Sequence, residues 1–116
     1  MKTQPFEAHL RTTPETVIID LNGEINAFAD EAINQAYSEA DSLGLENIML
    51  NFKDVTYINS TGIALIVGLM AKSRTNHKRL TVFGLTDHYI EIFQITRLAD
   101  FMSIYPDEET ALATTA

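Results

Sequence analysis

The order of the predicted secondary-structure elements constrains this fold more than any other feature of the sequence. Two extended segments come first, at Phe6–Arg11 and Glu15–Glu24, and Pro14 favours a turn between them. After them, segments with helical apolar spacing alternate with short apolar segments typical of buried strands. Because alternating strands and helices form parallel crossovers, the sequence predicts one mixed α/β sheet that begins with a β-hairpin.

The remaining elements keep this alternation to the end of the chain. The sequence predicts strands over Asn47–Phe52, Arg79–Leu85 and Ser103–Tyr105, and helices over Phe28–Leu43, Gly62–Ser73, Asp87 to about Ile95, and from Asp107 onward. We therefore expect an α/β fold with a single mixed β-sheet of about five strands and four helices. One domain is expected over residues 1–116, with its core at about 6–113.

Three details concern individual residues. Asn22-Gly23 is expected to end the second strand. The apolar residues of the first helix that are expected to face the core are Phe28, Ala32, Ala36 or Tyr37, Ala40 and Leu43. In the third helix, Ile90 and Phe93 are expected to face inward, with Ile92 as a further candidate.

Composition excludes several classes of function. Sixteen acidic against eight basic residues give a formal charge of −8, which argues against binding to nucleic acid or to an anionic membrane surface. There is no cysteine, and no spacing of acidic or histidine side chains indicates a metal site. The longest uncharged apolar run, Gly62–Ala71, is about half of what a bilayer span needs. We expect a soluble cytoplasmic protein without a cofactor.

The chemically informative segment is Asp54–Ala71, which reads DVTYINSTGIALIVGLMA. The helix that begins near Ser60 is apolar on every side, which indicates burial or contact with a partner. Two interpretations of the Ser60 hydroxyl stay open: it caps the helix, or it accepts a phosphate in the favourable field of a helix N-terminus. Gly62 is expected to allow close packing at the helix start.

The order of elements, Leu21-Asn22-Gly23-Glu24-Ile25 and the run YINSTGIALI resemble the STAS family, and more closely its single-domain bacterial anti-sigma factor antagonists. The resemblance covers about Phe6 to Ala113. It implies that Ser60 is phosphorylated by a serine kinase that is itself the anti-sigma factor, with Thr61 as a weaker candidate. It also implies that a PP2C-type phosphatase removes the phosphate, and that the unphosphorylated form binds the kinase and frees a sigma factor.

This chain departs from the family pattern at two positions. The family usually has Asp before the acceptor, where this chain has Asn59, and commonly has Asp where this chain has Asn26. Fewer carboxylates near Ser60 lower the electrostatic cost of phosphorylation. The residues expected to bind the partner are Asn26, Asn59, Ser60, Thr61, Gly62, Ile63 and Val67, with Met70 on the same helix.

Two other functions are compatible with parts of the sequence. The alternative is a non-catalytic STAS scaffold or accessory subunit, in a stress-signalling assembly or beside a lipid-transport ATPase. A hydrolase that uses Ser60 ranks last, because His9, His77 and His88 lie in unrelated segments and no Gly-x-Ser-x-Gly motif is present. The basic cluster of Lys72, Arg74, Lys78 and Arg79 is either a solvated turn near a helix C-terminus or a binding site for an acidic partner.

Overall fold

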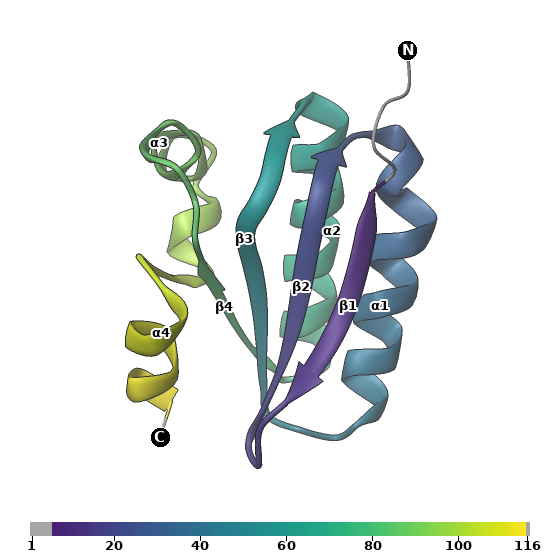
Figure 1. Cartoon of the computed structure of the whole chain (residues 1–116), viewed down its shortest axis with the longest axis vertical. Coiled ribbons are helices and arrows are strands. Elements are labelled where there is room, and N and C mark those ends of the chain that lie inside the picture. The colour runs from purple at the N-terminus through teal and green to yellow at the C-terminus, as the bar shows by residue number, and fades with distance from the viewer. Residues whose placement is uncertain (1–5, 116) are drawn as a thin grey trace.

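Five strands form one sheet in the computed structural model, which describes residues 6–115 (Figure 1). The strands are β1 (Glu7–Thr12), β2 (Thr16–Ile25), β3 (Asn47–Ile58), β4 (Arg79–Phe83) and β5 (Ser103–Tyr105). Their spatial order equals their chain order; β1 pairs with β2 antiparallel and every later pair is parallel. The predicted mixed sheet with an initial hairpin is therefore confirmed.

The helices lie on both faces of the sheet, as Figure 1 shows. Within the described chain they are α1 (Asp30–Ser42), α2 (Ser60–Thr75), α3 (Asp87–Ile95) and α4 (Glu108–Thr115), with 3-10 turns η1 (Ala27–Ala29) and η2 (Leu98–Asp100). The four predicted helices are confirmed. None of the helices in residues 6–115 is both long enough and apolar enough to span a bilayer.

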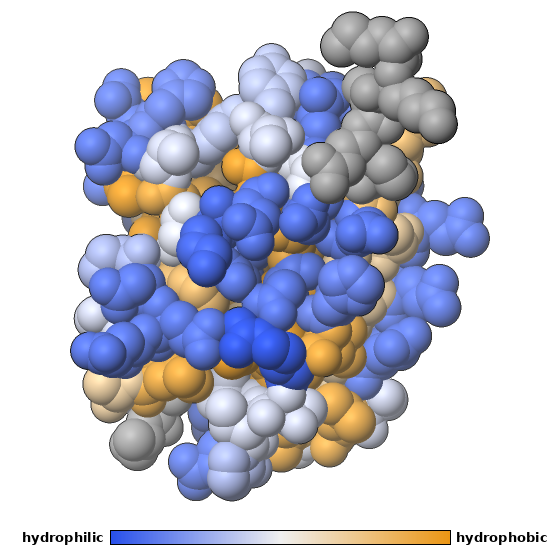
Figure 2. All heavy atoms as spheres, in the orientation of Figure 1, coloured by the Kyte–Doolittle hydropathy of each residue, from blue (hydrophilic) through white to orange (hydrophobic). Residues whose placement is uncertain are grey.

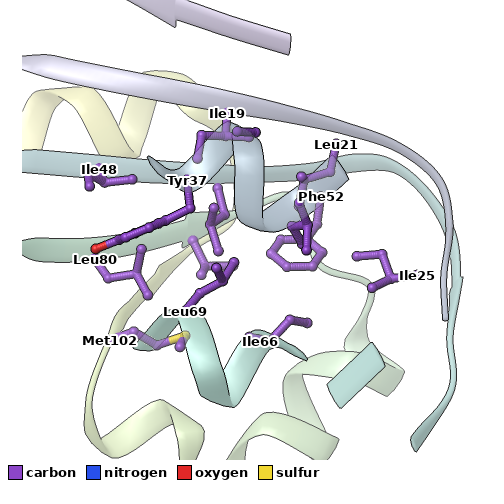
Figure 3. Packing of buried hydrophobic residues seen from close by; sticks show 14 of the residues in the cluster. Ile19, Leu21, Ile25, Tyr37, Ile48, Phe52, Ile66, Leu69, Leu80 and Met102 are labelled. Atoms are coloured by element: carbon purple, nitrogen blue, oxygen red, sulfur yellow. The ribbon is translucent and has the colours of Figure 1, made fainter. Parts of the chain in front are cut away.

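The larger apolar core lies between the sheet and the helices α1, α2 and α3. In Figure 3, Ile19 and Leu21 of β2 lie above Ile66 and Leu69 of α2, and the ring of Tyr37 of α1 extends into the same core. All five side chains are at most 2% exposed. Because successive residues of a strand point to opposite faces, Ile18 of β2 instead joins a smaller cluster beneath α4. Because Ile66 and Leu69 of α2 pack against one face of the sheet, the start of α2 is held at a fixed position relative to β2 and β3.

The second strand does not end at Asn22-Gly23, so that prediction was wrong. β2 continues to Ile25, with irregular register to β3 between Asp20 and Asn22 and again after Gly23. Gly23 has a φ of 103°, a backbone conformation that favours glycine. The turn residues therefore form an irregular, bulge-like stretch that bends the strand, which is a common use of glycine in sheets.

The prediction that Phe28 and Leu43 face the core was also wrong, since their exposed fractions are 94% and 49%. The short turn η1 precedes α1, which begins only at Asp30. The buried residues of the helix are Ile33, Ala36, Tyr37 and Ala40, so the predicted inward positions at Ala36, Tyr37 and Ala40 are confirmed and Ile33 joins them. In α3, the predicted Phe93 is buried, whereas Ile90 and Ile92 are half-buried and Tyr89 takes the second inward position.

The face of the sheet that carries α4 is polar over its centre, where Figure 2 shows hydrophilic side chains. Arg11 of β1 joins Asp20 of β2 at 2.5 Å and Glu108 of α4 at 2.6 Å, and the Asn51 amide donates to Asp20. The hydrogen bonds from Arg11 hold the pKa of both carboxyl groups below their usual values. These contacts tie α4 to the hairpin.

Candidate functional site

The candidate site lies where the carboxyl ends of β2 and β3 meet side by side. Ile25, the last residue of β2, pairs with Ile58, the last residue of β3. The N–H of Asn59 then donates to the Ile25 carbonyl oxygen at 3.2 Å, and the chain turns into α2 at Ser60. The carboxyl edge of a parallel sheet is where α/β proteins most often place their binding residues.

Gly62 holds the start of α2 against this edge. A Cβ at residue 62 would overlap the Ile25 carbonyl oxygen and would approach Ile58 Cγ2 to 2.9 Å. The expected close packing is therefore present, and it is a contact between α2 and the ends of both strands. Any larger residue at position 62 would require α2 or the strand ends to move.

Two asparagines cap the turns that frame Ser60. Asn59 Oδ1 accepts a hydrogen bond from the Gly62 N–H at 2.8 Å, which makes Asn59 the N-cap of α2. Asn26 Oδ1 accepts from the Phe28 N–H at 2.9 Å, and its amide donates to Glu24 at 2.6 Å. Asn and Asp cap helices about equally well. The two departures from the family pattern thus keep capping groups and leave out two negative charges.

Ser60 is consequently the first helical residue and not the cap. Its side chain is exposed, and among residues 6–115 its hydroxyl has no hydrogen-bond partner. The first N–H groups of a helix have no intrahelical acceptor, and the peptide dipoles place about half a positive charge there. The Ser60 hydroxyl is therefore unpaired within the described residues, and it lies in the positive electric field of the α2 N-terminus, which favours an anion.

Exposed apolar side chains surround this corner. Phe28 is 94% exposed on η1, which contacts α2, and Val67 is 41% exposed on α2. Tyr57, two residues before the cap, is half exposed. Thr61 is exposed, whereas Ile63 packs partly into the core. Met70 is likewise half-buried against the core. Large apolar side chains that are exposed on neighbouring elements are typical of protein interfaces.

Sequence reasoning missed Phe28 and Tyr57 as surface residues. The missed signal was Asn26, whose side chain begins a short turn before α1 and so takes Phe28 out of the helical phase. Residues 55–58 (VTYI) are strand-like in sequence, and in the structure β3 includes them, running six residues beyond the predicted end at Phe52 and pairing with β2 up to Ile58. The exposure of Tyr57 in this continuation was not predicted.

Tyr89 of α3 forms a hydrogen bond with the buried end of β3, next to the site. β4 pairs with β3 only as far as Asn51, so within residues 6–115 no strand pairs with the last part of β3 on that side. The Tyr89 hydroxyl lies there and accepts a hydrogen bond from the buried Ile58 N–H at 2.9 Å. The end of β3, and with it the position of Ser60, is thereby fixed by a side chain from α3.

The site combines an exposed serine hydroxyl with exposed apolar side chains. In the part of the chain that the structure describes, no cluster of three or more His, Asp or Glu side chains is arranged to hold a metal ion. Across the same residues, no hydrogen bond joins Ser60 to a histidine or to a carboxylate that could withdraw its proton. A nucleophilic serine needs such a base within hydrogen-bond reach.

A family model and the sequence of a known protein both match most of this chain. The STAS domain model matches residues 7–111. The anti-sigma-B factor antagonist of Staphylococcus aureus is 28% identical over 86 residues, which cover 74% of this chain and 80% of that protein.

Solved structures of similar fold include two structures of proteins named SpoIIAA, one in a phosphorylated and one in an unphosphorylated form. The Bacillus cell fate determinant SpoIIAA in its phosphorylated form has a TM-score of 0.72 at 28% identity, covering 94% of this chain and 99% of that one. The anti-sigma factor antagonist SpoIIAA in its unphosphorylated form has a TM-score of 0.71 at 24% identity, over 95% and 96% of the two chains. An anti-sigma factor antagonist from Mycobacterium paratuberculosis has a TM-score of 0.82 at 16% identity, over 97% of each chain, and shows a shared fold.

Proposed function

The chain belongs to the STAS domain family, and we propose that it is an anti-sigma factor antagonist whose binding to a serine kinase is switched by phosphorylation of Ser60. In this proposal the unphosphorylated form binds the kinase, which is also the anti-sigma factor, and thereby frees a sigma factor. A PP2C-type phosphatase restores that form. The proposal is supported by relatives named as anti-sigma factor antagonists and by a similar structure solved in a phosphorylated form.

The observation that carries the proposal is the free Ser60 hydroxyl at the first position of α2. Asn59 already supplies the capping oxygen, so the serine hydroxyl is not needed to complete the helix. It is exposed to a kinase, and a phosphate on it would lie beside the N–H groups and the positive dipole end of α2. Phosphorylation therefore leaves the fold intact.

The same phosphate changes what the surface can bind. It adds about −1.5 to −2 charges and three strong acceptor oxygens at one corner. A partner that covers Phe28 and Val67 with apolar side chains would have to desolvate this charge, which is costly without a cationic partner for it. Binding is then lost while the domain stays folded. Asn26 and Asn59 carry no charge, so the phosphate is added next to neutral caps.

The test compares variants of Ser60 against the serine kinase of the same organism. Ser60→Asp should bind the kinase at least about tenfold more weakly than Ser60→Ala, because only the former places a charge in the interface. Ser38→Asp is the matched control, since it adds the same charge to an exposed position of α1. Equal affinity of the two Ser60 variants, measured by calorimetry, would contradict the proposal.

A second measurement identifies the partner. The Ser60→Ala chain, used as bait in its own cell, should recover a serine kinase, and Phe28→Ala in that bait should abolish the recovery. Phe28 is the most exposed large apolar side chain of the corner, and truncation of an aromatic residue is among the costliest changes at an interface. Recovery of a lipid-transport ATPase or of a large stress-signalling assembly would replace the kinase proposal with the scaffold alternative.

A further inference from the structure

A second surface of unusual charge lies at the other end of α2. Four of the eight Lys and Arg residues of this acidic chain fall within residues 72–79. Arg74, Lys78 and Arg79 line a broad hollow of about 560 Å³, together with Leu80, Ala99, Asp100, Phe101, Met102 and Ser103. We call this set of lining residues the basic hollow.

The charges of the basic hollow are largely uncompensated. Its acidic residue, Asp100, is already paired with Arg97 at 2.5 Å. In residues 6–115 no carboxylate forms an ion pair with Arg74 or Arg79. Lys78 donates to the Leu45 carbonyl oxygen at 2.9 Å, which fixes its position and leaves its charge intact.

The dipole of α2 explains only part of this positive charge. Cations stabilise a helix C-terminus, where the dipole of α2 amounts to about −0.5 charge. Lys72 and Arg74 lie in the last turn of α2, and Arg79 is the first residue of β4. The basic hollow carries three full positive charges, on Arg74, Lys78 and Arg79. Because these exceed half a negative charge, the hollow keeps a net positive charge.

The side chains around these charges indicate what they bind. The Arg74 guanidinium lies 4.7 Å from the centre of the Phe101 ring, a cation–π contact that holds the guanidinium in place. Phe101 is 46% exposed, and Leu80 and Met102 form a buried apolar floor. Guanidinium groups bind carboxylates in a bidentate geometry. The positioned guanidinium of Arg74 and the nearby Arg79, beside an aromatic ring and an apolar floor, fit a peptide that carries both carboxylates and apolar side chains.

We propose that the basic hollow binds an acidic peptide segment of a protein partner, with Arg74 and Arg79 as its carboxylate ligands. The hollow is separate from the Ser60 corner. α2 has 16 residues and so spans about 24 Å, and Figure 1 shows its two ends at opposite ends of the sheet. A partner held there keeps its contact whether or not Ser60 is phosphorylated.

The experiment measures the affinity of the full chain for a labelled probe, a twelve-residue peptide of Asp and Glu with two central Leu residues. The double variant Arg74→Gln/Arg79→Gln should weaken binding at least about tenfold, because each arginine contributes a charge-assisted hydrogen bond. The double variant Lys53→Gln/Lys72→Gln is the matched control. It removes the same charge from exposed positions, and Lys72 donates to Asn34 of α1 at 2.6 Å and does not line the hollow.

The expected result is loss of affinity in the arginine variant and less than about a twofold change in the lysine control and in Ser60→Asp. Amide chemical shifts that change on peptide addition should map to residues 99–103. Three outcomes would overturn the proposal: no peptide binding, equal weakening by both double variants, or tighter binding of tripolyphosphate than of the peptide. The near-ultraviolet circular dichroism of both double variants shows whether the fold is intact.

Discussion

At the residue scale, position 62 has no room for a side chain, because a Cβ there would overlap the Ile25 carbonyl oxygen. Gly62→Ala should lower the free energy of unfolding by about 2 kcal/mol, since α2 must shift or the strand ends must move. Gly68→Ala is the control in the same helix, where nothing lies within 4 Å of an added Cβ, and it should gain about 0.5–1 kcal/mol from helix propensity. Urea denaturation measures both. Equal stability of the two variants would contradict the packing described for the site.

The residues around Ser60 illustrate which features could be predicted from the local sequence and which could not. The segment around Ser60 was identified correctly as a helix start, because Asn, Ser and Thr before an apolar run are strong N-terminal signals. Which of them caps the helix depends on where β3 stops, and that is decided by the pairing of Ile58 with Ile25. No local sequence pattern indicates this pairing, because it joins two segments that are far apart in the chain. The cap is therefore Asn59, and Ser60 is released from a structural role.

At the element scale, α3 is attached to the end of β3 through one hydroxyl. Tyr89→Phe removes the acceptor of the buried Ile58 N–H and should cost about 1–3 kcal/mol of stability, the usual penalty for an unsatisfied buried donor. Tyr57→Phe is the matched control, because that side chain is half exposed. It should change the thermal midpoint little. A Tyr89→Phe variant as stable as the control would show that the hydrogen bond contributes nothing.

The attachment of α4 should depend on pH. Arg11 lowers the pKa of Asp20 and Glu108 in the folded chain. A carboxyl group with a lowered pKa contributes stability that is present above its unfolded pKa, here about 4 to 4.5. This stability is lost as the pH falls through the folded value. The wild-type chain should therefore lose more unfolding free energy between pH 6 and 3 than Arg11→Gln, by no more than about 1 kcal/mol because the groups are partly exposed.

Chemical denaturation at a series of pH values measures this difference. Arg11→Gln retains the length of the side chain and removes its charge, so both carboxyl groups should return toward their ordinary pKa values. Parallel pH profiles for the wild type and the variant would contradict the assigned role of Arg11.

The order of the elements was predictable because each helix and strand carries its own periodicity. The alternation after the hairpin led directly to the parallel pairs from β2 to β5. The extents of β2 and β3 were not predictable in the same way. Gly23 reads as a turn residue, yet it lies in an irregular stretch of a strand whose continuation depends on its neighbour.

At the scale of the whole molecule, the chain carries two different surfaces at the two ends of α2. The Ser60 corner combines a free hydroxyl with exposed apolar side chains such as Phe28, and the basic hollow combines Arg74 and Arg79 with Phe101. Ser60 was expected from the resemblance to a family, whereas the exposure of Phe28 was not. The basic hollow was indicated by a run of basic residues whose meaning stayed open. Only the folded chain distinguishes Lys72, which contacts α1, from the arginines that line the hollow.

The central claim is that a phosphate on Ser60 changes binding and leaves the fold unchanged. The most direct test is to compare the chain with and without phosphoserine at position 60, measuring the dissociation constant of the kinase complex and the thermal midpoint of each form. We expect affinity to fall by at least about tenfold while the midpoint is unchanged or higher, because the phosphate lies at the N-terminus of α2. Equal affinities of the two forms, or loss of affinity only through unfolding of the phosphorylated form, would contradict the claim.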